Sequence, residues 1–144
     1  MQRRDFLLTA LGAAAFTSAS AGPVLAQGGP TSMHPPKYKA LQDSTAACVS
    51  TGEDCLRHCL AMTAMHDTSM AACEQAVVEL IAACRALQTL ASVNSTFTPA
   101  FARNVAAVCD ACRKECEPFV NKYLECKASF DACTTCAAEC RRIA

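Results

Sequence analysis

The spacing of the cysteines constrains the fold of this chain more than any other feature. Twelve of the 144 residues are cysteines, and within a cluster they recur at intervals of three, four, seven or eleven residues. Each residue of an α-helix advances by about 100°, so these intervals return a side chain to nearly the same face. The cysteines of segments 48–59, 73–84, 109–116 and 126–140 each share a stripe no wider than roughly 80°. The spacing therefore predicts four helices, each with one stripe of thiols.

The remaining residues also favour helices. From Lys37 onward alanine, leucine and charged residues dominate, and the alternating β-branched runs typical of strands are missing. We expect helices over about 36–65, 69–92, 98–117 and 120–142, with Gly52 a weak point in the first. Four helices with short connections predict an all-α fold, an antiparallel four-helix bundle.

Capping residues and prolines predict where the helices end. HDTS (66–69) supplies a cap for the second helix from Asp67, Thr68 or Ser69. Thr98, followed by Pro99, is expected to cap the third helix. Pro118 lacks a backbone donor and is expected to end or kink that helix.

The fourth helix has too few large apolar residues to fill an interior face by themselves: Val120, Tyr123, Leu124, Phe130 and Ile143. A free cysteine is a small hydrophobic residue and is often buried. Leucine and valine, however, fill space better and carry no redox chemistry. Twelve such residues therefore indicate that the thiols have a function, and we predict that they line the core.

The N-terminal segment resembles an export signal. Residues 2–16, QRRDFLLTALGAAAF, join the pair Arg3 and Arg4 to an apolar run too short to anchor in a membrane, which is the twin-arginine form. We predict a signal peptide over 1–26, cleaved after Ala26, a flexible lead-in over 27–36 and the bundle over 37–144. The protein is then expected in the periplasm or on the periplasmic face of internal membranes.

Charge gives no argument for nucleic acid or a membrane as partner, because the chain holds 13 basic and 13 acidic residues. A disulfide scaffold is the usual explanation for an exported, cysteine-rich chain. It conflicts with the twin-arginine route, which carries proteins already folded in the reducing cytoplasm. Pairs one turn apart, such as Cys112 and Cys116, have Cβ atoms about 5–6 Å apart, farther than a disulfide usually allows.

Soft metal ions explain the thiols better, since thiolates select Cu(I), zinc or iron–sulfur clusters. Structural zinc needs four converging ligands, whereas helical stripes predict a row of sulfurs, which suits Cu(I) with two thiolates per ion. Exchange of each thiol proton for one Cu(I) would also keep the core neutral. The predicted ligands are Cys48, Cys55, Cys59, Cys73, Cys84, Cys109, Cys112, Cys116, Cys126, Cys133, Cys136 and Cys140.

A second set of soft ligands lies beside the cysteines in segment 55–70. His58, Met62 and Met65 follow one stripe, and Met70 comes just after the predicted break between helices. We predict that these four residues form a mouth through which metal reaches the core. The sequence leaves open whether His66, His34 and Met33 bind metal.

These motifs together resemble the exported branch of the bacterial copper storage proteins. The resemblance covers the chain from about Tyr38 and rests on GEDCLRHC (52–59), the three methionines that follow, AAC (82–84), FTPA (97–100), CDACRKEC (109–116) and CTTCAAEC (133–140). It implies a four-helix bundle, assembled as a homotetramer, that stores many Cu(I) ions on cysteine thiolates. It also implies an open end lined by the predicted mouth residues and a supply of copper to methane monooxygenase. Relatives carry about one more cysteine on the fourth helix.

No catalytic set of residues is visible, so we expect a protein that is not an enzyme. Its expected partners are copper donor or acceptor proteins or chelators. An iron–sulfur electron carrier remains an alternative because CDACRKECEP slightly resembles a ferredoxin run. A helical domain stapled by disulfides is the other.

Overall fold

The computed structural model describes residues 31–144, so the signal peptide, its cleavage site and the start of the lead-in lie outside the described residues. His34–Ala144 form one compact unit. Its elements are α1 (Lys39–Ala64), α2 (Ala71–Ser92), α3 (Thr98–Cys116), the short 3₁₀ helix η1 (Glu117–Phe119) and α4 (Leu124–Ile143).

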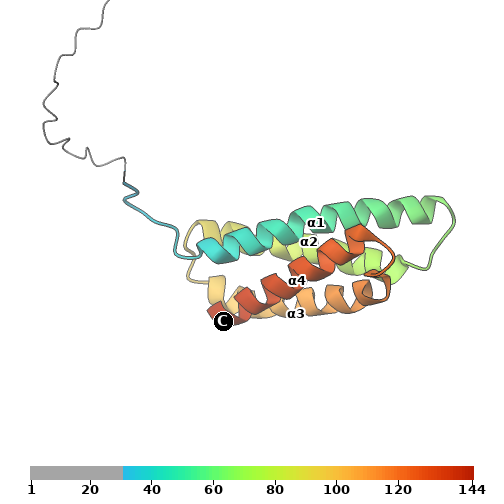
Figure 1. Cartoon of the computed structure of the whole chain (residues 1–144). Coiled ribbons are helices and arrows are strands. Elements are labelled where there is room, and N and C mark those ends of the chain that lie inside the picture. The colour runs from blue at the N-terminus through green and yellow to red at the C-terminus, as the bar shows by residue number, and fades with distance from the viewer. Residues whose placement is uncertain (1–30) are drawn as a thin grey trace, which may run out of the picture. The chain divides into compact units, whose positions relative to one another are not determined.

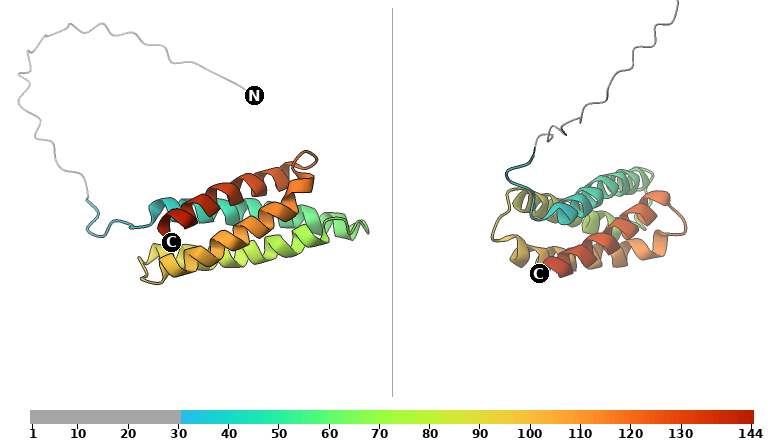
Figure 2. Two further views of the ribbon diagram at one scale, coloured as in Figure 1. Left: turned by 90° about the horizontal axis from the view of Figure 1, so that it is seen from below. Right: turned by 60° about the vertical axis from the view of Figure 1, so that its left-hand side comes forward.

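The four long helices form an antiparallel bundle, as predicted. Successive helices run in opposite directions, and the C-terminus lies at the end of the bundle where α1 begins (Figures 1 and 2). α1 packs against α2 and α4, and α3 packs against the same two helices. Each helix thus has two neighbours and presents one face to a shared core.

Gly52 allows α1 and α2 to approach closely. The sequence marked it as a weak point, but α1 continues through it and buries it. A Cβ atom at this position would lie 3.1 Å from Cγ1 of Ile81 on α2, which is closer than comfortable packing. The absence of a side chain therefore serves the contact between the two helices.

α1 and α2 both end with a residue in the left-handed conformation. His66 follows α1 with φ 64°, and Asn94 follows α2 with φ 53°. At each end a backbone N–H reaches back to the last turn, from Asp67 to the Met62 carbonyl and from Ser95 to the Leu90 carbonyl, each at 3.0 Å. These bonds satisfy carbonyl groups that the helix ends leave free.

The predicted capping was wrong at two helix starts. Met70 occupies the cap position of α2, and Asp67 Oδ1 instead accepts a bond from the Ser69 N–H at 2.9 Å within the connection. Thr98 is already helical and fully buried, and its hydroxyl makes no hydrogen bond. Pro118 ends α3 as predicted, but the chain after it forms η1 and a turn, so α4 begins at Leu124 instead of Val120.

The core has an apolar end and a thiol-lined remainder. Where α1 and α3 begin, fully buried aliphatic residues fill the interior: Leu41, Leu87, Ala91, Ala102 and Val105. Beyond them the buried residues are largely cysteines. The bundle therefore has ordinary packing at one end, and this end anchors helices whose other faces bury thiols.

Candidate metal centre

All twelve cysteines lie in the core as free thiols. Each is at most 1% exposed, although they come from all four helices. This burial confirms the predicted stripes and the predicted cysteine-lined core. The closest pair of sulfurs in hydrogen-bond contact, Cys73 and Cys116, is 3.4 Å apart, well beyond the bond length of about 2.05 Å in a disulfide.

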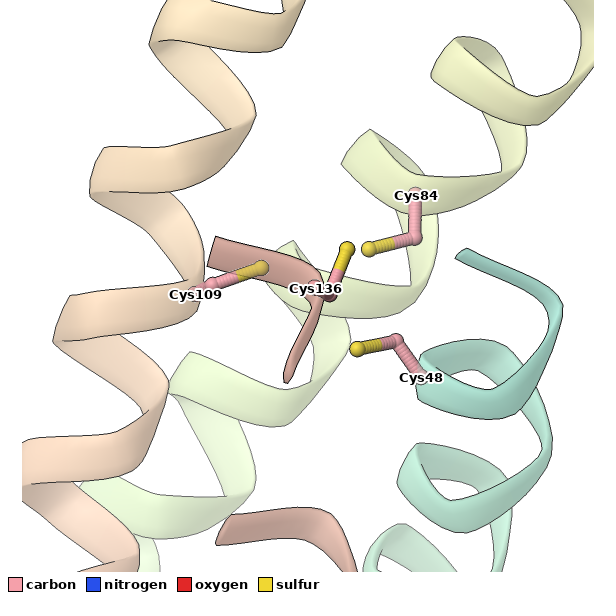
Figure 3. Close-up of side chains that lie close together, drawn as sticks. All are labelled: Cys48, Cys84, Cys109 and Cys136. Atoms are coloured by element: carbon pink, nitrogen blue, oxygen red, sulfur yellow. The ribbon is translucent and has the colours of Figure 1, made fainter. Parts of the chain in front are cut away.

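Four thiols, one from each helix, converge at the middle of the core. Cys48 on α1, Cys84 on α2, Cys109 on α3 and Cys136 on α4 have sulfurs that all lie within 4.8 Å of one another. Figure 3 shows these four side chains pointing toward one another from their separate helices. We call these four residues the inner thiol group. The sequence predicted a row without such a four-ligand group, so this convergence is a finding of the structure.

A second group lies nearer the end of the bundle where α2 and α4 begin. Cys55, Cys73 and Cys126 have sulfurs within 4.8 Å of one another, and we call them the outer thiol group. The Cys55 sulfur is 3.9 Å from both of the others. Cys116 extends the group through its 3.4 Å contact with Cys73.

The remaining contacts join the two groups into one row. Cys112 lies 4.0 Å from Cys116 and interacts with Cys133, which in turn interacts with the inner group. Cys140 lies 3.9 Å from Cys136 and continues the row. On α2 the fully buried residues between its two cysteines are Val77 and Leu80. The connection between the groups therefore runs along α3 and α4.

The pairing of the inner thiols within each hairpin could have been found from helix register. In an antiparallel pair, a step forward on one helix matches an equal step back on the other. Cys48 and Cys59 are eleven residues apart, and so are Cys73 and Cys84; Cys109 and Cys112 are three apart, and so are Cys133 and Cys136. These equal steps keep cysteines level within each hairpin, and that signal was in the sequence.

Burial and neighbouring thiols keep most of the thiols protonated. Burial, then the neighbouring Cys73, raises the pKa of Cys126 to about 12. Contact with Cys55 lowers the pKa of Cys59, but Cys73 and burial raise it more, to about 11. Hydrogen bonding to Cys109 and then to other thiols raises the pKa of Cys48.

Cys136 is the exception within the inner group. Hydrogen bonding with neighbouring thiols, Cys109 first and then Cys140, lowers the pKa of Cys136. When several thiols surround one sulfur, that sulfur loses its proton before the others, because the remaining thiols stabilise the thiolate.

The sulfur distances fit shared metal ions. With a metal–sulfur distance of about 2.3 Å, two sulfurs on one ion lie no more than about 4.6 Å apart. The close pairs measure 3.4–4.0 Å, so one ion can bridge each of them. Sulfurs such as Cys55, which touches two others, can also be shared between ions.

The four predicted mouth residues have different environments. His58 and Met62 are half-buried, Met70 is 1% exposed and Met65 is 66% exposed. His58 lies over the ring of Tyr123, with ring centroids 4.4 Å apart, and its Nε2 is buried without a hydrogen-bond partner. His58 and Met62 therefore lie at the boundary of the core, and Met65 lies on its outside.

The three residues left open by the sequence lie on the surface. His66 and His34 are exposed, and Met33 is 86% exposed. From the sequence, Tyr123 was only an apolar residue of the fourth helix and Ser129 only part of its core face, and neither was assigned a role at the site. Ser129 lies on the stripe of α4, three residues after Cys126 and four before Cys133, and it is fully buried. Its place in that spacing was the signal that could have identified it.

Comparison with known proteins gives one family. The chain gave no match to curated proteins. Among the described residues, no helix is both long and apolar enough to cross a membrane. The family model Csp, described as copper storage protein, matches residues 34–144, which is the whole bundle with its buried thiols. This chain therefore belongs to the copper storage protein family.

Proposed function

We propose that the bundle stores multiple Cu(I) ions in its core, held by the twelve cysteine thiolates. The observation that carries this proposal is the burial of all twelve thiols in one core, where five pairs of sulfurs lie 3.4–4.0 Å apart and the four inner sulfurs lie within 4.8 Å of one another. Thiolates are the ligands that Cu(I) prefers. Each bound Cu(I) would displace one thiol proton, so a filled core would stay neutral and avoid the cost of buried charge.

His58, Met62, Met65 and Met70 are proposed to bind Cu(I) at the mouth. Imidazole and thioether ligands are softer than oxygen ligands and suit a weakly held ion in transit. The half-buried His58 and Met62 lie where a passing ion would leave solvent. The more deeply placed thiolates would then take the ion over.

The proposed role is storage without catalysis, in the periplasm or on the periplasmic face of internal membranes. Export by the twin-arginine route suits a protein whose thiols must stay reduced until they are filled. The proposed assembly is a homotetramer. The stored copper would pass, through acceptor proteins or chelators, to exported or membrane copper enzymes such as methane monooxygenase.

Two other metal functions compete for the inner thiol group. Four thiols that converge from four helices also suit one tetrahedral zinc ion. An iron–sulfur cluster needs room for its inorganic sulfides, which sulfurs within 4.8 Å of one another leave scarce. Zinc would use four thiols and leave the rest of the row unexplained, so we favour Cu(I).

Anaerobic titration of the reduced protein tests the proposal. We expect Cu(I) to saturate near one ion per cysteine, with no free copper detected by a competing chelator before that point. Zinc storage would instead saturate at about one ion for every four thiols. Saturation far below the cysteine count would contradict the storage row.

A matched variant separates core binding from binding at the surface. Cys48→Ala with Cys136→Ala removes two of the four inner thiols, and we expect capacity to fall by about two to four ions because bridged ions lose both partners. His34→Ala and Met33→Ala change exposed residues, and we expect the capacity to stay the same. Equal losses in both variants would contradict a thiol-lined store.

A further inference from the structure

An aromatic lid closes the core at the mouth. The Tyr123 ring lies against the His58 imidazole, with centroids 4.4 Å apart and planes inclined by 49°. Phe119 stacks on Tyr123 in turn, with centroids 6.4 Å apart and planes inclined by 27°. Phe119 and Tyr123 are partly buried against the core. We call these two residues the aromatic lid.

The lid is part of the connection between α3 and α4. The Tyr123 N–H donates to the Phe119 carbonyl at 3.0 Å, and this bond holds the two rings close together. Tyr123 itself has extended backbone angles and forms the cap position of α4. A change of its χ1 rotamer can therefore swing the ring while both helices stay in place.

The lid and the histidine that it contacts lie one helical turn from two members of the outer thiol group. Cys126 lies one turn beyond Tyr123, and Cys55 lies one turn before His58; both thiols are fully buried. The Nε2 atom of His58 has lost contact with water without gaining a hydrogen-bond partner. Burial of such an atom is costly, so the contact with Tyr123 holds the imidazole in a position that a bound ion would satisfy.

The other end of the core has no buried histidine or methionine among the described residues, and His34, which precedes α1, is exposed. There Tyr38 is 6% exposed and lies over the aliphatic end of the core, and the backbone N–H of Lys37 donates to Asn94 Oδ1 across the connections at 2.8 Å. This end is apolar and lacks the histidine and methionines of the mouth. At this end a copper ion would lose its water ligands and find no replacement. At the mouth it can exchange them for His58 and Met62.

We propose that Tyr123 gates the passage of Cu(I): it positions His58 over the outer thiol group and must swing aside before an ion passes between solvent and the thiols. The inference rests on the proposed storage function and adds a rate-controlling residue to it. Tyr123 is not a ligand in this proposal. It sets how fast the store fills and empties and leaves the capacity unchanged.

Kinetics with defined Cu(I) chelates test the gate. The unaltered protein and Tyr123→Ala are mixed anaerobically with a Cu(I)–bathocuproine-type chelate, and the loaded proteins with an excess of free chelator. We expect Tyr123→Ala to load and unload about tenfold faster, the change given by loss of an aromatic contact of about 1.4 kcal/mol from the barrier. The number of ions at saturation should match that of the unaltered protein.

Three further variants identify the cause. Tyr123→Phe keeps the ring and should keep the original rates. Tyr38→Ala removes the other tyrosine of the chain, at the apolar end, and should leave the rates unchanged. Tyr123→Leu preserves apolar volume without a planar ring, and it serves in place of Tyr123→Ala, with the same expected acceleration, if the alanine variant loses helicity.

The outcomes separate the gate from storage itself. Equal rates in the unaltered protein and the Tyr123 variants, at full capacity, would overturn the gate. Acceleration by Tyr38→Ala as large as that by Tyr123→Ala would also overturn it, because copper would then pass the apolar end. Failure of the unaltered protein to take up copper would instead overturn the storage function.

Discussion

At the scale of single residues, Ser129 interrupts the cysteine series of α4. It is fully buried, its Oγ makes no hydrogen bond, and it lies beside Cys112, whose thiolate its hydroxyl would stabilise. A hydroxyl is a poor ligand for Cu(I) compared with a thiolate. The row of sulfurs thus has a gap close to the connection between the inner and outer thiol groups.

Ser129→Cys should fill that gap. We expect its capacity to rise by about one Cu(I), because the new thiol would have sulfur neighbours with which to share an ion. Thr98→Cys is the matched control, since Thr98 is also a fully buried hydroxyl without a partner but lies at the apolar end. Both variants are titrated anaerobically. An equal gain in both would show that any added thiol binds copper, whatever its position.

The raised thiol pKa values predict how stability depends on pH. The pKa values of Cys59 and Cys126 rise from 9.0 to about 11 and about 12. The folded protein therefore keeps protons that the unfolded chain releases above pH 9. Stability from these groups is complete below pH 9 and falls as the pH rises toward 11 to 12. Cys136, with its lowered pKa, acts in the opposite direction but is outnumbered.

Thermal unfolding at about pH 8, 9 and 10.5 checks this dependence. We expect the melting temperature of the reduced, copper-free protein to fall over this range. The copper-loaded protein shares the lysines and tyrosines but has no thiol protons to lose, so its melting temperature should change much less. A parallel fall in both forms would assign the effect to groups other than the thiols.

At the scale of helices, α1 and α2 pack closely at Gly52. A Cβ atom there would already lie 3.1 Å from Ile81, and the methyl groups of a valine would press on it further. Gly52→Val should therefore destabilise the copper-free bundle by about 1–3 kcal/mol despite its better helix propensity. Ala61→Val places the same side chain at an exposed site of α1 and should cost less than about 1 kcal/mol. Urea unfolding compares the two, and a Gly52→Val variant at least as stable as the unaltered protein would show that helix propensity, and not packing, governs position 52.

The helix boundaries show what sequence could predict and what it could not. The thiol spacing predicted the four helices, and Pro118 predicted the end of α3. Both signals act within a single helix, so they can be read without knowledge of the packing. The starts of α2 and α4 depend on tertiary packing. Met70 is buried at the cap of α2, and Tyr123 contacts His58 at the cap of α4. Such tertiary contacts are not indicated by capping preferences.

At the scale of the whole molecule, the sequence predicted that the thiols face one core but not which thiols meet. Stripes show the direction of each side chain around its own helix. The convergence of Cys48, Cys84, Cys109 and Cys136 also depends on how far the helices slide past one another, which packing at sites such as Gly52 decides. The contact of Tyr123 with His58 could not be predicted because it joins the connection between α3 and α4 to α1, which is distant in the sequence.

The copper-free bundle should be fully helical. Its apolar end and its neutral thiols bury without metal, unlike zinc fingers, which need metal in order to fold. Far-ultraviolet circular dichroism before and after Cu(I) loading should give nearly equal helical signals. A large rise on loading would show that metal, and not packing, assembles the four helices.

The matched register of the helices also restricts how the length of this chain can change. Deleting one residue between Cys48 and Cys55 would turn the two parts of α1 by about 100° relative to each other and carry thiols out of the interior. Loss or gain of a residue in the connection between Met65 and Met70 leaves every stripe intact. Insertions and deletions are therefore tolerable in the connections, whereas inside the helices they would move thiols out of the core. The intervals between cysteines matter as much as the cysteines themselves.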